Sequence, residues 1–479
     1  MDQSRGAIDK LEVRKERGLR IRCCATGTLS VGLFAATSAC IPSFGTPSAA
    51  GVDAGGMETA SGEAGDSSRS STGTDAQASP CSGSDGACGS PNSASSSSTG
   101  SSSANSDASG SGSSSATSSQ SAVCQDGATQ CLFNGVQTCI DGAWSDVTPC
   151  PATTPSCSAG VCGQPSSCQV AINGTANCGS AADESCCASL DVPGGTYYRT
   201  YTNSGDGGTG EADLASVSGF RLDKYLVTVG RFRQFVNAWS NGYLPAAGSG
   251  KHVHLNGGSG LVSAGALGAD GGVVYESGWD STDWNNTSDV DPTTANLTST
   301  SCGGVATWTA SFGNQENLPI VCVSWFEAYA FCIWDGGFLP SSAESEYAAA
   351  GGNQQLEYPW GSAAPGAANE YAIYDCNYPS QENCTNGPNV APVGTTALGP
   401  GYWGQLDLTG EVSEFVLDWY TTSYPDPCAD CAYLTVTPYR MDRGGSYMAS
   451  ATSLLSTYFD GFPPSLGSDA IGFRCARTP

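Results

Sequence analysis

Histidine and basic residues are scarce in this chain. Its 479 residues include two histidines and 18 lysines and arginines, against 45 aspartates and glutamates, and the net charge is −27. A chain this acidic repels the phosphates of nucleic acids and other anionic surfaces, so we exclude a nucleic-acid partner. The sequence also has no Gly-x-Ser-x-Gly motif and no phosphate loop of the Gly-x4-Gly-Lys-Ser/Thr type, so it gives no support for the enzymes that carry them.

A long hydrophobic run is also missing. The apolar segment from Ala25 to Ala36 is too short to span a bilayer, but it follows a basic stretch and precedes Thr37-Ser38-Ala39-Cys40. This pattern predicts an export signal over residues 1–39 with lipidation of Cys40, although Thr37 stands where such sites usually have Leu. The alternative is ordinary cleavage near Ala39 or Ala49, which would release a secreted protein.

Residues 40–122 have almost no large apolar side chains and are rich in Ser and Gly. Ordering such a segment would cost conformational entropy with nothing buried in return. We therefore expect a disordered linker, with a small disulfide-rich module over residues 123–166 and one large domain over residues 167–479.

Cysteine, in contrast, is abundant. Of 23 cysteines, two lie in the predicted signal and Cys40 would be acylated, which leaves 20, an even number that suits full pairing in an oxidising compartment. Six fall between Cys124 and Cys162, where the absence of Cys-x2-Cys pairs and histidine favours disulfides over zinc but leaves the connectivity open. Cys428 and Cys431 form a Cys-x-x-Cys unit that fits a structural clip or, as the alternative, a thiol–disulfide exchange site.

Three helices are predicted in the large domain. Phe232, Phe235 and Trp239 share one face of a helix over about residues 229–239. Ser324 and Ser341, each followed three residues later by Glu, predict two helices that begin with capping boxes. The remainder should be short strands and long loops, which makes the fold class α+β.

Several blocks of this domain occur in the order found in one known family. They include Phe220–Thr228, Gly337–Ala349, Asp407–Phe415, the run Arg443-Gly444-Gly445-Ser446-Tyr447-Met448-Ala449 and the closing Gly472-Phe473-Arg474-Cys475. The domain resembles the formylglycine-generating enzymes, or sulfatase-modifying factors. The resemblance implies an irregular, loop-rich fold related to C-type lectins.

The family's catalytic cysteine pair is missing. Its positions correspond here to Ala449 and Leu454, so the resemblance implies no copper site, because Cu(I) in this family is held by two soft thiolates. Ser345, Ser413 and Phe338 also replace two tryptophans and an arginine that are usual in the family. The related iron-dependent sulfoxide synthases use three histidines, whereas this chain has only His252 and His254, which we interpret as an incidental pair.

The resemblance also implies a metal site and a disulfide. Asp407, Gly410, Val412 and Glu414 match a family calcium site, in which side-chain and carbonyl oxygens suit a hard cation. Turn-forming acids are the alternative interpretation. Cys332 and Cys475 match a family bridge, and we expect local bridges Cys376–Cys384, Cys428–Cys431 and Cys302–Cys322.

Together these features predict an exported protein, anchored by lipid to a bacterial outer membrane or cell surface, or secreted. Its large domain would be a calcium-stabilised, non-catalytic module that binds a peptide, a protein or a glycan. The alternative is an active sulfatase-modifying oxidoreductase that generates formylglycine on sulfatase-type substrates, or another activity of that family.

Overall fold

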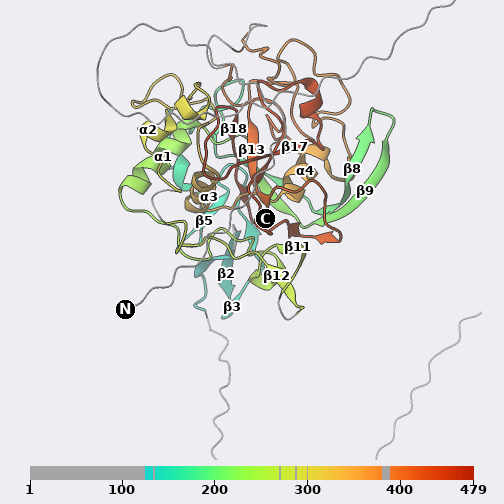
Figure 1. Cartoon of the computed structure of the whole chain (residues 1–479). Helices are drawn as coiled ribbons and strands as arrows, with labels where there is room; N and C mark the ends of the chain where they lie inside the picture. Colours follow the sequence, from blue (N-terminus) through green and yellow to red (C-terminus); the bar gives the residue numbers. More distant parts are fainter. Residues whose placement is uncertain are drawn as a thin grey trace, which may run out of the picture. The chain divides into compact units, whose positions relative to one another are not determined.

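The computed structural model describes residues 124–479 apart from 133–134, 269–270, 286–288, 299, 380–383 and 385–388 (Figure 1). The expected export signal, Cys40 and the Ser/Gly-rich linker lie outside these residues. Among the residues that are described, no helix is both long enough and apolar enough to cross a membrane.

The first segment of the described chain is a small β module stapled by disulfides. Strand β2 pairs with three antiparallel neighbours, and a separate hairpin follows. The strands are β1 (Thr129–Leu132), β2 (Gly135–Ile140), β3 (Ala143–Trp144), β4 (Thr148–Pro149), β5 (Ser156–Ser158) and β6 (Val161–Gly163). Three bridges close within the module: Cys124–Cys139, Cys131–Cys157 and Cys150–Cys162. Two more follow it, Cys168–Cys187 and Cys178–Cys186.

The large domain is built from small sheets. Strand β10 (Phe220–Asp223) lies between β7 (Ser189–Val192) and β19 (Ala476–Arg477), so that the two ends of the domain meet in one sheet. A four-stranded sheet has the order β17-β16-β13-β18 and contains the almost fully buried β13 (Ser413–Trp419). Its other strands are β16 (Arg440–Arg443), β17 (Phe459–Phe462) and β18 (Ile471–Gly472).

Two further sheets flank these. The long hairpin of β8 (Gly195–Asn203) and β9 (Gly208–Val217) pairs through β9 with β14 (Cys428–Ala429). Strand β11 (Val262–Leu267) lies between β12 (Val273–Tyr275) and β15 (Cys431–Ala432). The short β14 and β15 are consecutive in sequence and carry Cys428 and Cys431, which are bridged, so this clip joins the two sheets.

The three predicted helices form, and the α+β fold is confirmed. Helix α1 spans Val229–Ser240, and α3 (Trp325–Trp334) and α4 (Ser342–Ala350) each begin with the expected capping box. Helix α4 ends at Gly351, whose φ of 63° is the left-handed conformation that glycine adopts easily. Helix α2 (Thr294–Leu297) and short 3-10 segments at Ser166–Cys168, Asn256–Gly258, Thr300–Cys302, Gly352–Gln354 and Ala451–Leu454 complete the helical elements.

The main core lies between α1, α3 and the last strands of the chain. Phe232 of α1 stacks on Phe331 of α3 with ring centroids 5.8 Å apart, and the ring of Phe473 contacts both edge-on. Close to these rings, Cys332 is bridged to Cys475. The bridge fixes the chain end to α3 across a sequence separation of 143 residues.

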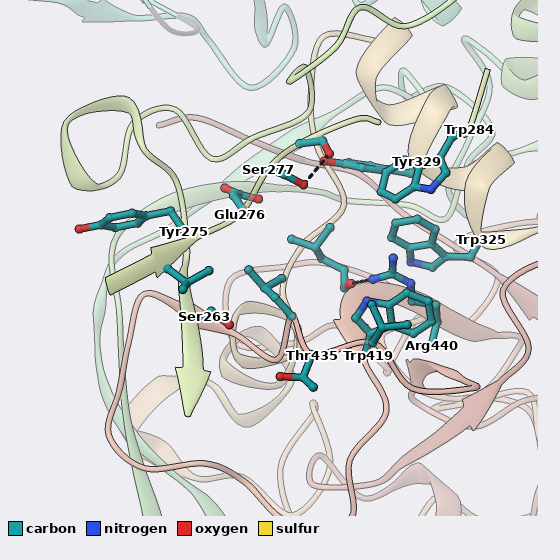
Figure 2. A pocket seen from close by; sticks show the side chains of 15 residues that line it. Ser263, Tyr275, Glu276, Ser277, Trp284, Trp325, Tyr329, Trp419, Thr435 and Arg440 are labelled. Carbon is teal, nitrogen blue, oxygen red and sulfur yellow. Dashed lines mark hydrogen bonds between the residues drawn. The ribbon is translucent and has the colours of Figure 1, made fainter. Parts of the chain in front are cut away.

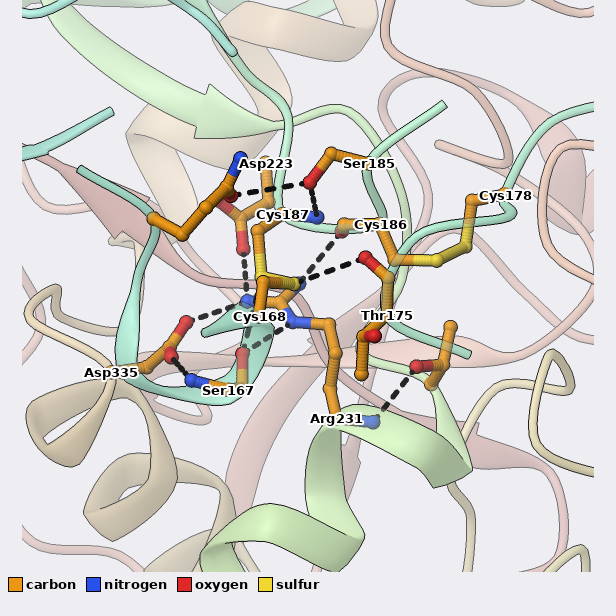
Figure 3. Close-up of a disulfide and its surroundings, with 12 residues drawn as sticks. Ser167, Cys168, Thr175, Cys178, Ser185, Cys186, Cys187, Asp223, Arg231 and Asp335 are labelled. Atoms are coloured by element: carbon orange, nitrogen blue, oxygen red, sulfur yellow. Dashed lines mark hydrogen bonds and ion pairs between the residues drawn. A yellow bond between two sulfur atoms is a disulfide. The ribbon is translucent and has the colours of Figure 1, made fainter. Parts of the chain in front are cut away.

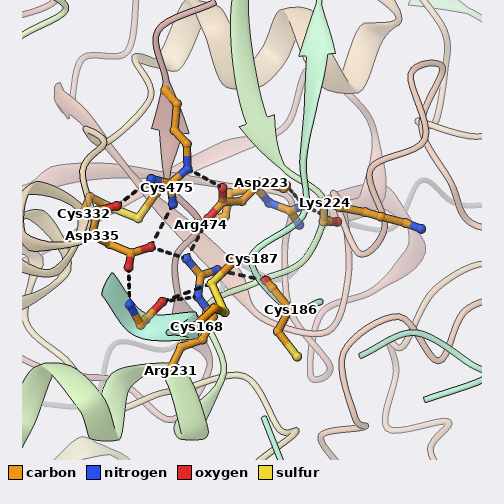
Figure 4. A network of polar contacts seen from close by, with 12 residues as sticks. Cys168, Cys186, Cys187, Asp223, Lys224, Arg231, Cys332, Asp335, Arg474 and Cys475 are labelled. Carbon is orange, nitrogen blue, oxygen red and sulfur yellow. Dashed lines mark hydrogen bonds and ion pairs between the residues drawn. A yellow bond between two sulfur atoms is a disulfide. The ribbon is translucent and has the colours of Figure 1, made fainter. Parts of the chain in front are cut away.

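A buried network of charges surrounds that bridge. Asp335, at the C-terminal end of α3, accepts hydrogen bonds from Arg231 (2.7 Å) and Arg477 (2.8 Å), and both arginines also contact Asp223 (Figure 4). Burial would raise the pKa of Asp335, but the two arginines outweigh it and lower that pKa. Ion pairs therefore join α1, the C-terminal end of α3, β10 and β19.

The same network reaches the segment that precedes the domain. Ser167 donates its N–H to Asp335 at 2.7 Å, and its hydroxyl accepts a hydrogen bond from Arg231 at 3.0 Å, next to the Cys168–Cys187 bridge (Figure 3). Ser167 has no measurable exposure. Ser167, the first residue of the large domain that we expected over residues 167–479, is thus packed against α1 and the end of α3.

Replacing Asp335 by Asn should destabilise the protein by about 3–5 kcal/mol, because it leaves two buried arginines short of a charge. Asp426→Asn is the matched control, because Asp426 is also an arginine partner but its side chain is 56% exposed. We expect less than about 1 kcal/mol for the control. Urea unfolding of the oxidised proteins measures both values, and equal effects of the two substitutions would contradict the central role of the network.

Candidate functional site

The segment that carries the family resemblance has a structural role. Arg443 donates to Glu346 (2.7 Å) and to Tyr424 (2.6 Å), and its Nε donates to Ser342 of α4 (2.9 Å). Gly444 follows with a φ of 89°, and a Cβ there would lie 2.7 Å from the carbonyl oxygen of Leu408. Arg443 therefore fixes β16 against α4. Gly444 lets the chain turn at a point where a residue with a Cβ would not fit.

The positions of the family's thiols hold hydrocarbon side chains. Ala449 is half-buried, and Leu454 is fully buried at the end of the 3-10 segment Ala451–Leu454. Neither side chain can ligate copper. The main chain around Ala449 binds the loop beside it, because Asp375 donates to the carbonyl of Ala449 and Cys376 to that of Tyr447.

The cysteines of the described chain are all used in disulfides. Cys332–Cys475, Cys376–Cys384, Cys428–Cys431 and Cys302–Cys322, which we expected from the sequence, are each joined in the structure. With the five bridges of the N-terminal segment they account for every cysteine from Cys124 to Cys475. The described part of the chain therefore offers no free thiolate to a metal.

The four expected calcium ligands lie in one turn and strand, but their carboxylates already have partners. Both oxygens of Glu414 bind Arg474, at 2.6 Å and 2.8 Å, and Asp407 accepts from the N–H of Gly394 (2.6 Å) and the hydroxyl of Thr396 (2.9 Å). A guanidinium at Glu414 competes with a cation for the same oxygens. These contacts do not fit an open calcium site, and calcium at Asp407, Gly410, Val412 and Glu414 stays an untested prediction.

His252 is a structural residue that the sequence did not reveal. Its ring lies between two carboxylates, with Nδ1 3.0 Å from Glu276 and Nε2 3.0 Å from Glu344, the third residue of α4 and part of its capping box. Burial opposes a charge on this ring, but Glu344 and Glu276 outweigh it and raise the pKa of His252 to about 10. His252 thus has a structural role that the sequence did not predict, because its ring ties its loop to α4.

His254, the other member of the pair, has the opposite environment. Both of its ring nitrogens are buried without a hydrogen-bond partner among the described residues. Burial lowers the pKa of His254 to about 4, because Glu344 attracts its proton too weakly to offset the lost hydration. The two histidines therefore do not act as a pair of metal ligands in this arrangement.

A cavity of about 380 Å³ is lined in part by Glu276, the carboxylate that contacts His252 (Figure 2). It is lined by Trp325 and Tyr329 of α3, by Trp419 of β13 and by Arg440 of β16. Trp284 lines it as well. Residues 274–278 and 434–436 complete the wall. Val436 is 74% exposed and Tyr275 39%, so the cavity is open to solvent on their side.

Arg440 is the cationic centre of this cavity. Its guanidinium carbon lies 3.5 Å from the ring centroid of Trp325 and 3.6 Å from that of Trp419, between the two rings (Figure 2). The side chain is buried, with Nη1 donating to the carbonyl of Leu417 at 2.6 Å. Burial lowers the pKa of Arg440, against the opposing influence of Tyr329 and Asp418. Stacking between two indoles holds the charge in a fixed place.

Comparison with known proteins places the chain in a family. Residues 175–479 match the sulfatase-modifying factor enzyme 1-like domain, and the chain belongs to that family. A formylglycine-generating enzyme of Thermomonospora curvata is 28% identical over 313 residues, which cover 60% of this chain and 92% of the relative. An inactive Cα-formylglycine-generating enzyme 2 of Bos taurus is 32% identical over 172 residues, which cover 34% of this chain and 52% of the relative.

A solved structure gives a weaker match. PvdO from Pseudomonas aeruginosa aligns with a TM-score of 0.39 and 18% identity, over 66% of this chain and 99% of that chain. The sequence relatives include proteins named as formylglycine-generating enzymes and proteins named as inactive Cα-formylglycine-generating enzyme 2. Membership of the family therefore leaves the activity of this chain to be decided by its own residues.

The His252 ion pairs predict a loss of stability at alkaline pH. A raised folded-state pKa gives stability that is complete below the unfolded value, 6.5, and is lost as pH rises toward about 10. His252→Gln should remove this dependence, whereas His254→Gln should keep it, because the lowered pKa of His254 acts only below 6.5. Melting temperatures across this window measure the effect, and a flat wild-type profile would contradict the charged His252.

The contacts of Glu414 predict that calcium does not stabilise the domain through this turn. Melting temperatures in excess calcium and in chelator should be equal, because Arg474 already neutralises the carboxylate that calcium would bind. Glu414→Gln is the diagnostic variant. A calcium-dependent rise in the wild type that Glu414→Gln abolishes would establish the calcium site instead.

Proposed function

We propose that this domain binds a ligand and does not generate formylglycine. The observation that carries the proposal is the disulfide pairing of every cysteine from Cys124 to Cys475, with Ala449 and Leu454 at the positions of the family's thiols. In this family Cu(I) is held by two thiolates, and the described part of the chain offers no free thiolate. The relative named as inactive is a precedent for a family member without this activity.

Binding is supported by the cavity around Arg440. It is open, lined by three tryptophans and two tyrosines, and centred on the guanidinium of Arg440, which is the usual composition of a small-ligand site. Trp325, Tyr329, Trp419 and Arg440 come from α3, β13 and β16, so the aromatic and charged centre of the site is held by helix and strand residues. A peptide, a protein segment or a small molecule can enter beside Val436.

Export is part of the proposal. Nine disulfides in the described chain suit an oxidising compartment, which agrees with a signal over residues 1–39 and an anchor at Cys40. We propose a lipid-anchored protein of a bacterial outer membrane or cell surface. Ordinary signal cleavage, which gives a secreted protein, is the alternative.

One observation keeps the oxidoreductase alternative testable. The Cys376–Cys384 bridge lies beside the segment of the missing thiols, because Cys376 donates its N–H to the carbonyl of Tyr447 at 2.8 Å. Reduction of this bridge would free two thiols near Ala449. Activity that depends on Cys376 would therefore support the alternative.

The test is an aldehyde assay. Incubating the protein with Cu(I), oxygen and a peptide that contains the Cys-x-Pro-x-Arg target should give no formylglycine by mass spectrometry, with or without prior reduction. The enzyme of Thermomonospora curvata, assayed in parallel, is the positive control. Aldehyde above the level without protein would contradict the proposal, and its loss in Cys376→Ser would assign the activity to the bridge.

A further inference from the structure

Arg440 differs from the other buried arginines in having no carboxylate partner. The structure describes seven buried arginines, and six of them form ion pairs, with the pairs Arg199–Asp426, Arg221–Asp191, Arg231–Asp335, Arg443–Glu346, Arg474–Glu414 and Arg477–Asp223. Arg440 is 3% exposed, and its Nε is buried without a hydrogen-bond partner among the described residues. A buried guanidinium left in this state is costly unless an anion reaches it.

The two nearby acids are committed elsewhere. Glu276, which lines the same cavity, accepts from the ring of His252 and from the N–H groups of His252 and Leu261. Asp418 accepts from the N–H groups of Ser342 and Tyr433, both at 2.7 Å. Neither carboxylate forms an ion pair with Arg440, so the missing anion must come from outside the described chain.

The residues that line the cavity limit the size and charge of the ligand and the polarity of its body. Trp284, Tyr329 and Leu417 offer apolar surface, and a volume of about 380 Å³ admits a molecule of the size of an aromatic amino acid or somewhat larger. A cationic ligand is disfavoured, because Arg440 already covers the faces of Trp325 and Trp419 and would repel it. A dianion such as a phosphate is disfavoured as well, because the lining has one cation and includes Glu276.

We propose that the cavity binds a monocarboxylate with an apolar or aromatic body, whose carboxylate pairs with Arg440 and whose body lies against the indole and phenol rings. The proposal deepens the binding function above and rests on it. Such a carboxylate is found on free aryl or alkyl acids and at the C-terminus of a peptide that ends in an apolar residue. The chemistry is shared, and the probes below distinguish the two sources.

The test uses the full exported chain and two pairs of probes. One pair is 3-phenylpropanoate and its uncharged amide; the other is acetyl-Gly-Gly-Phe with a free or an amidated C-terminus. Binding is followed by tryptophan fluorescence, because Trp284, Trp325 and Trp419 line the cavity, and by calorimetry. We expect the acids to bind at least about tenfold more tightly than their amides, as for a charge-assisted hydrogen bond.

Arg440→Met removes the charge but keeps a long apolar stem between the two indoles, so it should abolish the preference for the acid.

Val436 offers a pair of variants with little risk to folding, because this side chain is 74% exposed at the mouth of the cavity. Val436→Glu should weaken binding of the acid and Val436→Lys should strengthen it, each by a few-fold at low salt. Val170→Glu is the control, because Val170 is 56% exposed and does not line the cavity.

Preferential binding of either acid, lost in Arg440→Met and shifted in opposite directions by the two Val436 variants, supports the proposal. Binding of the peptide acid alone identifies a peptide C-terminus as the source, and binding of both acids identifies the free acid as sufficient. Equal binding of acids and amides, or no response to Arg440→Met and the Val436 variants, overturns it. The aldehyde assay depends on other residues. If the protein binds neither acid and forms no aldehyde, this inference is overturned, but the proposal that the domain does not generate formylglycine still stands.

Discussion

Asp335 accepts charge-assisted hydrogen bonds from two arginines that come from opposite ends of the large domain. Arg231 lies in the first helix, Arg477 lies in the last strand, and Asp335 itself ends α3. With few long elements, such a fold has little regular hydrogen bonding to define where its loops go. The network of ion pairs and the Cys332–Cys475 bridge beside it hold together the elements that these loops connect.

The motif residues of the family have packing roles in this domain. This explains how the domain keeps them without the family's thiols. Arg443 and Gly444 are needed for packing, because one binds Glu346 and the other passes the carbonyl of Leu408 at a distance that excludes a Cβ. Arg474 likewise holds Glu414 and the carbonyl of Asp407. Packing alone accounts for these residues, so their presence does not indicate catalysis.

The sequence predicted those elements whose contacts are local, and those segments that the chain shares with its family. The capping boxes at Ser324 and Ser341 use residues three positions apart, and they form as predicted. The sequence was silent where distant residues meet: His252 reaches Glu344 across 92 positions, and Arg440 lies between Trp325 and Trp419. No periodicity or spacing marks these contacts, because tertiary packing alone creates them. The calcium prediction depended on matching ligand types, and it could not show that Arg474 binds the same carboxylate.

The central claim is that every cysteine from Cys124 to Cys475 is in a disulfide, so that none is free to bind a metal. The most direct measurement is alkylation of the denatured, unreduced protein, followed by mass spectrometry to locate each labelled cysteine. The account predicts no label on any cysteine from Cys124 to Cys475. Full labelling of two cysteines, above all of Cys376 and Cys384 beside the Ala449 segment, would contradict it, because the protein would then hold a free thiol pair near Ala449.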